Sequence, residues 1–158
     1  MEKKFYLTKK GLEKIKKEYQ KLKEIKLAKV KGGNVPKILH SEDLDPEYLV
    51  FREDMSFLET RITDLEYILK NTELIKIPPR GKRNIVGLGA TVTLEEGDNQ
   101  INEFTVVGTL EANPGEGKIS SDSPVGKALL HRKIGDEIII TSPIKVVYKI
   151  KKIKYHKI

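Results

Sequence analysis

The segment DPEYLVFREDMSFLETRITDLEYILK (residues 45–70) gives the clearest indication of secondary structure in the chain. Its apolar residues recur at alternating spacings of three and four, forming an unbroken heptad seam of Tyr48, Phe51, Met55, Leu58, Ile62, Leu65 and Leu69. Such a seam predicts an amphipathic helix that buries one narrow stripe against a second helix. Asp45 is suited to cap this helix. Pro46 suits its first position, and Glu47 favours the positive end of the helix dipole.

A second seamed helix is expected before this stretch. Thr8 can cap a helix that starts near Lys9, and its apolar residues again follow helical spacing: Leu12, Ile15, Tyr19 and Leu22. Gly32, Gly33 and Pro36 predict a break near residues 31–36. Each helix has one stripe to bury, so the two favour an antiparallel helical hairpin, a coiled coil with its tip near residues 37–47. The alternative is two helices lying flat on the domain that follows.

In the remainder of the chain, apolar and polar residues alternate with a period of two, as is typical of β-strands. Pro78 and Pro79 mark a linker over residues 77–83. The expected strands are residues 90–94, 102–107, 118–120, 137–141 and 145–153, with one short helix over 123–130. The sequence therefore predicts an α+β protein. Residues 1–76 would form the hairpin, and residues 84–158 a small antiparallel sheet domain with one short helix.

Charge is segregated along the chain. Residues 1–40 hold thirteen Lys and four Glu, whereas residues 41–66 hold nine acidic residues and two Arg. This asymmetry, with a net charge of +7, predicts an anionic partner, either nucleic acid or an acidic protein surface. The absence of cysteine excludes a disulfide scaffold and a thiol nucleophile. No signal-peptide pattern and no apolar run of about 20 residues is found, so we expect a cytoplasmic protein that does not bind membranes.

One segment could carry chemistry. SEDLDPE (residues 41–47) places four carboxylates within six residues at the expected tip. Clustered carboxylates repel one another, and a hard cation with oxygen ligands would relieve that repulsion. Equally, the cluster could be a solvated, acidic helix start. The three His have no metal-ligand spacing, and no phosphate-cradling glycine loop is found, so a self-contained hydrolase is not indicated.

Five segments together resemble the GreA/GreB family of transcription elongation factors. They are LTKKGLEKI (residues 7–15), FLETRI (57–62), GATVTL (89–94), GKISSDSPVGKALL (117–130) and IGDEI (134–138). The resemblance covers nearly the whole chain in order and spacing. It implies a coiled-coil N-terminal domain and an FKBP-like C-terminal domain that docks on RNA polymerase.

The resemblance also implies a function. The protein would be a bacterial elongation factor that binds RNA polymerase at the secondary channel and stimulates cleavage of the RNA 3′ end in backtracked, arrested complexes. It would not itself be an enzyme, because the polymerase supplies the nuclease activity. No cofactor would bind to the protein alone, and Mg²⁺ would be shared with the polymerase active site.

Site residues follow from the same resemblance. Asp43, Asp45 and Glu47 would be the tip carboxylates that act within the polymerase active site, with Asp43 directed at the Mg²⁺. Arg52 would contact the RNA. The tip segment DLDPEY (residues 43–48) keeps the family's Asp-Leu and Glu-Tyr but is two residues shorter and lacks an internal Glu-Asn.

The docking surface is expected in the short helix of the second domain, at Asp122, Ser123, Pro124 and Val125. The implied partners are bacterial RNA polymerase and the 3′ end of the nascent RNA, with DNA as a further candidate and no membrane. We expect a monomer.

Three alternatives remain open from the sequence. An inhibitor of the anti-Gre type would enter the secondary channel without promoting cleavage. A prolyl isomerase would need an aromatic-lined pocket, but residues 80–158 contain only Phe104, Tyr148 and Tyr155 as aromatics. A general nucleic-acid-binding coiled coil would explain the Lys-rich first helix but not the acidic tip.

Overall fold

The chain forms two compact units. The computed structural model describes residues 3–31, 46–97, 99–141 and 144–156. The first unit, here the hairpin unit, is Leu12–Asn71, and the second, here the sheet unit, joins Met1–Gly11 to Thr72–Ile158. The hairpin unit is therefore inserted in sequence between two parts of the sheet unit. Residues at both ends of the 1–76 segment lie in the sheet unit.

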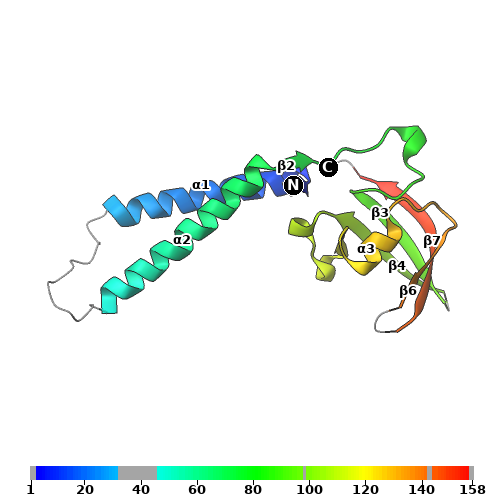
Figure 1. Ribbon diagram of the computed structural model, residues 1–158. Helices are drawn as coiled ribbons and strands as arrows, with labels where there is room; N and C mark the ends of the chain where they lie inside the picture. Colours follow the sequence, from blue (N-terminus) through cyan, green and yellow to red (C-terminus); the bar gives the residue numbers. More distant parts are fainter. Residues whose placement is uncertain (1–2, 32–45, 98, 142–143, 157–158) are drawn as a thin grey trace. The chain divides into compact units, whose positions relative to one another are not determined.

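In the described part of the hairpin unit there are two long helices (Figure 1): α1 spans Lys9–Lys31 and α2 spans Pro46–Lys70. The expected helices are confirmed, including the start of α1 after Thr8 and of α2 at Pro46. The interior of α2 holds Ile62, Leu65 and Ile68. Ile68, which the heptad seam did not include, is also buried, and Leu69 of the predicted seam is half-buried.

A five-stranded sheet forms the body of the second unit. Its strands are β3 (Ala90–Glu96), β4 (Gln100–Val107), β5 (Lys118–Ser120), β6 (Glu137–Ile140) and β7 (Val146–Tyr155), in the order β5-β4-β3-β7-β6. The β3–β4, β3–β7 and β6–β7 pairs are antiparallel, as expected. The β4–β5 pair is parallel, so the sheet is mixed. The α+β class is confirmed.

The core of the sheet unit lies on one face of this sheet. Alternate residues of β3 and β7 supply Val92, Leu94 and Ile150, all fully buried. The short helix α3 (Pro124–Leu129), labelled in Figure 1, adds Leu129 to the same cluster. This is the twofold pattern read from the sequence, with the apolar face turned inward.

A second, two-stranded sheet had not been predicted. β1 (Phe5–Leu7) pairs in parallel with β2 (Thr72–Leu74), and Ile75 N–H donates to Leu7 O at 2.9 Å. Leu7 is fully buried. Three 3-10 turns occur among the described residues of the sheet unit: η1 (Arg80–Lys82), η2 (Thr109–Glu111) and η3 (Pro114–Glu116).

Candidate functional site

The predicted tip is only partly described. Asp43 and Asp45 lie outside the described residues. Glu47 lies in the first turn of α2 and is exposed to solvent. Pro46 starts the helix, as its fixed φ and missing N–H favour. A carboxylate in this first turn interacts favourably with the helix dipole, so the charge of Glu47 stabilises the start of α2.

Arg52 is an exposed residue of α2, five positions after Glu47, or about 7.5 Å along the helix axis. Some other cations of the hairpin unit are paired: Lys29 Nζ lies 3.5 Å from Asp54, and Lys26 Nζ lies 3.5 Å from Glu59. Arg52 forms no ion pair or hydrogen bond with any residue that the structure describes. Its guanidinium is therefore available for an anionic ligand.

Polar contacts fix the register of α1 against α2. Arg61 binds Glu18 through two hydrogen bonds, of 2.8 and 3.2 Å, and Tyr19 Oη donates to Glu66 at 2.9 Å. The hydrogen bond that Arg61 donates to the Glu18 carboxylate raises the pKa of Arg61 and so keeps the guanidinium charged. These contacts join the middle of α1 to the second half of α2, and the Lys29–Asp54 pair joins the last turns of α1 to the first half of α2. The helices are therefore antiparallel, with the start of α2 remote from Asn71.

The predicted docking segment forms a capped helix start. Ser123 is the N-cap of α3: its Oγ accepts from Gly126 N–H at 3.0 Å and donates to Ser120 O at 2.6 Å. Asp122 is exposed, and its carboxylate accepts from the Thr109 hydroxyl at 3.0 Å. Asp122 and Ser123 therefore have different roles. Ser123 is occupied by capping, while Asp122 retains an exposed carboxylate.

The next two residues of this segment also differ. Pro124 occupies the first turn of α3 and is exposed. Val125 is half-buried and packs on the core of the sheet unit. The structure therefore brings Asp122 and Pro124 to the surface together, whereas Val125 and Ser123 support the helix beneath them.

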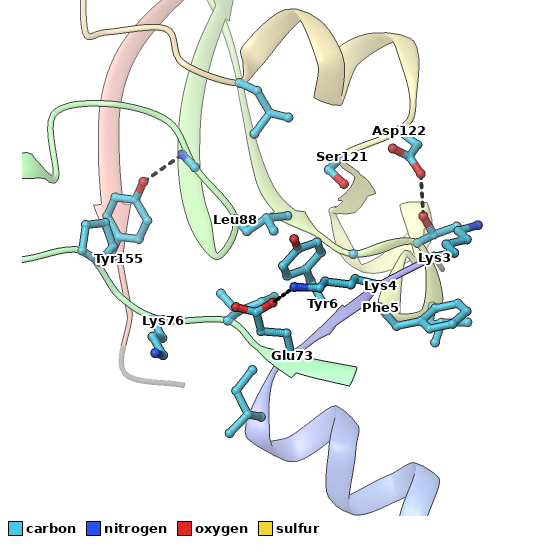
Figure 2. Close-up of a pocket in the computed structure, with 18 of the residues that line it drawn as sticks. Lys3, Lys4, Phe5, Tyr6, Glu73, Lys76, Leu88, Ser121, Asp122 and Tyr155 are labelled. Carbon is cyan, nitrogen blue, oxygen red and sulfur yellow. Dashed lines mark hydrogen bonds and ion pairs between the residues drawn. The ribbon is translucent and has the colours of Figure 1, made fainter. Parts of the chain in front are cut away.

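A groove of about 750 Å³ lies in the sheet unit beside this segment, and Figure 2 shows Ser121 and Asp122 at its edge. Its apolar lining comes from Phe5, Tyr6, Leu74, Leu88, Leu110 and Leu130. His131 lines it with a φ of 68°, a left-handed conformation that is costly for a residue with a side chain and that often accompanies a functional surface. Sequence reasoning missed the groove because its lining comes from segments that are far apart in the chain.

One wall of the groove is held by Tyr155 of β7. Its hydroxyl donates to Ile85 O at 2.6 Å and accepts from Gly87 N–H at 2.8 Å. Burial raises the pKa of Tyr155, and the Gly87 hydrogen bond offsets part of that rise. The neutral phenol therefore fixes the 85–88 segment, which carries Leu88 into the groove (Figure 2).

The described residues contain no cluster of three or more His, Asp or Glu side chains that could hold a metal ion. Of the predicted tip carboxylates, Glu47 alone belongs to this part of the chain. No helix in the described ranges is long and apolar enough to cross a membrane.

A helical hairpin inserted in sequence into a mixed-sheet unit with a capped short helix defines a two-part protein. Two family models match it: "Transcription elongation factor, N-terminal" over residues 5–74, and "Transcription elongation factor, GreA/GreB, C-term" over residues 81–155. The chain belongs to the GreA/GreB family of transcription elongation factors.

Relatives of similar length support this assignment. The chain is 39 % identical to transcription elongation factor GreA of Clostridium acetobutylicum, covering 97 % of this chain and 98 % of that protein. It is 38 % identical to GreA of Bacillus velezensis, covering 90 % of each. The crystal structure of GreA factor homolog 1 of Thermus thermophilus is 27 % identical over 96 % of this chain and 99 % of that one, with a TM-score of 0.42, too low for a conclusion.

Proposed function

We propose that this protein enters the secondary channel of a bacterial RNA polymerase with its hairpin and stimulates cleavage of the 3′ end of backtracked RNA. The observation that supports the proposal most strongly is the position of the acidic start of α2 within the antiparallel hairpin. Its antiparallel register puts the acidic start of α2 at the end of the unit opposite Asn71. A rod whose far end is acidic suits delivery of carboxylates into a deep site.

The tip residues would act on a metal held mainly by the polymerase. Asp43, Asp45 and Glu47 offer only carboxylate oxygens, the ligands that Mg²⁺ prefers, and these would complete a half-formed metal site. When bound, Mg²⁺ polarises phosphoryl oxygens and activates water. The protein contributes negative charge and does not need a complete ligand set of its own.

Arg52 would hold the extruded RNA. Its exposed guanidinium has no partner among the described residues and lies about five residues, or 7.5 Å, beyond Glu47. A planar, permanently charged group suits bidentate contacts with a phosphate. An elongation inhibitor would not need to hold RNA in this way, so Arg52 supports the cleavage function.

The sheet unit would dock on the polymerase through Asp122 and Pro124, beside the groove. An exposed carboxylate at the edge of an apolar depression is a common arrangement for a small protein interface, with apolar contact at the centre and charge at the rim. The groove is large enough to accept one or two side chains from the polymerase surface.

A transcript cleavage assay on stalled, backtracked polymerase tests the function. The wild-type protein should release 3′ RNA fragments, and Asp43→Ala should lower the cleavage rate by more than about tenfold while polymerase affinity is retained. Asp43→Asn, which keeps the shape and removes the charge, should behave like Asp43→Ala. A wild-type protein that binds polymerase and slows elongation without releasing any fragment would show an inhibitor instead.

A further inference from the structure

The start of α1 is held by a carboxylate that comes from far along the chain. Glu111, in the η2 turn, accepts a hydrogen bond from Thr8 N–H at 2.8 Å and another from the Thr8 hydroxyl at 2.5 Å. Thr8 Oγ1 in turn accepts from Gly11 N–H at 3.1 Å. All three residues lie in the sheet unit.

These contacts form a capping box that is split between two segments. In the usual box, a Thr caps the helix and a Glu three residues later reaches back to the N–H of that Thr. Here the residue three positions after Thr8 is Gly11, and Glu111 occupies the position of the missing carboxylate. The segment after Thr8 has no Glu at the position that would complete the cap, and Glu111 of η2 supplies the carboxylate instead.

Two glycines make room for this arrangement. A side chain at Gly11 would collide with the carboxylate of Glu111, and one at Gly108 would collide with the backbone oxygen of Tyr6. Gly108 immediately precedes η2, so the turn lies directly against β1. Leu7, between Tyr6 and Thr8, is fully buried. The first turn of α1 is thus fixed to the sheet unit by hydrogen bonds, close backbone packing and burial.

We propose that Glu111 is a positioning residue, which acts through Thr8 and the first turn of α1 to limit the motion of the hairpin and so delivers its tip accurately. This inference rests on the cleavage function proposed above. It assigns a role in catalysis to a residue that touches neither RNA nor metal.

The length of α1 shows why its first turn matters. α1 has 23 residues and is continuous from Lys9 to Lys31, so it extends about 34 Å. A change of about ten degrees at its base moves its far end by roughly 6 Å over that length. Misplacement of a reacting group by about 1 Å can reduce a rate by roughly a hundredfold. Even small angular freedom at the base would therefore reduce cleavage strongly.

A pair of variants separates positioning from simple helix capping. Glu111→Ala removes the long-range carboxylate. Adding Gly11→Glu to Glu111→Ala restores a local capping box, T-x-x-E, in the space that Glu111 has left. Glu116→Ala is the matched control, because Glu116 lies in the neighbouring η3 turn and its carboxylate pairs only weakly with Lys118, at 3.6 Å.

The first measurement uses the full-length protein without polymerase. The chain has no cysteine, so Thr60→Cys on α2 and Ile139→Cys on β6, both exposed, can carry spin labels for a pulsed-dipolar distance distribution. The unsubstituted pair and Glu116→Ala should give the same narrow distribution. Glu111→Ala should broaden it, and the double variant should stay broad although hydrogen exchange shows Thr8 N–H protected again.

The second measurement is transcript cleavage at saturating factor. Glu111→Ala and the double variant should both cleave about tenfold more slowly than wild type, with unchanged polymerase affinity. Recovery of cleavage and of the narrow distribution in the double variant would reduce Glu111 to a helix cap and overturn the proposal. An unchanged distribution in Glu111→Ala would also overturn it. If the wild-type protein does not cleave at all, the proposed function fails, while the distance measurement still decides whether Glu111 restrains the hairpin.

Discussion

Tyr155→Phe should destabilise the sheet unit and loosen the groove wall. The substitution removes one hydroxyl and leaves two main-chain groups, Ile85 C=O and Gly87 N–H, without their partner. Each such hydrogen bond contributes about 1 kcal/mol net, and an unsatisfied buried group costs about 1 to 3 kcal/mol. Tyr155 is only half-buried and water can reach part of the site, so we expect a loss of about 1 to 2 kcal/mol in the free energy of unfolding.

The assay is urea denaturation followed by circular dichroism, with hydrogen exchange at Gly87 as the local measurement. A loss of this size lowers the urea midpoint by roughly 1 M for a small unit. Tyr148→Phe is the matched control: it makes the same change on the same strand, and the Tyr148 hydroxyl forms no hydrogen bond with the described residues. Equal stability of the two variants would refute the role given to the Tyr155 hydroxyl.

The pH dependence follows from the direction of the shift. Burial raises the pKa of Tyr155 in the folded protein above its ordinary value, so the folded state favours the neutral phenol. Its contribution is fully present below the unfolded pKa of about 10 and is lost as pH rises through the higher folded pKa. The stability difference between wild type and Tyr155→Phe should therefore stay constant from neutral pH to about pH 10 and shrink above it.

Three further outcomes are expected. Ser123→Ala removes the cap on Gly126 N–H and should cost about 1 kcal/mol in urea denaturation, whereas Ser123→Asp should retain most of the stability. Asp122→Lys should weaken polymerase binding in a surface-capture assay, and Glu137→Lys, an equal charge reversal on β6, should not; similar losses would assign the effect to net charge. Arg52→Ala should lower RNA cleavage and crosslinking to the RNA 3′ end together, with an unchanged melting temperature, and a stability loss would indicate a structural role.

The helices could be predicted from the sequence because their signals are local. The heptad seam, Thr8 as a cap and Pro46 at the first helical position together determined the bounds of α1 and α2 within a residue or two. The alternating strands and the Ser123–Pro124 helix start were equally local. In each case the deciding residues lie within one turn or one strand of each other.

The features that were missed depend on long-range pairing. β1 and β2 have three residues each, too short for a periodic pattern, and they exist because Phe5 pairs with Thr72 across the whole hairpin unit. The parallel β4–β5 pair depends on a connection between Val107 and Lys118 that carries the chain back along β4, so that β5 runs in the same direction. The contact of Glu111 with Thr8 could not be predicted from the sequence, because the two residues are far apart in the chain and meet only in the folded protein.

The inserted position of the hairpin has a consequence for how the chain is made. β1 leaves the ribosome before its strand partner Thr72–Leu74, and η2 with Glu111 follows later still. During synthesis, therefore, the apolar seams of α1 and α2 can pack together before β1 has its strand partner. The hydrogen bonds between Thr8 and Glu111 can form only after residue 111 has been synthesised, because Glu111 supplies the acceptor.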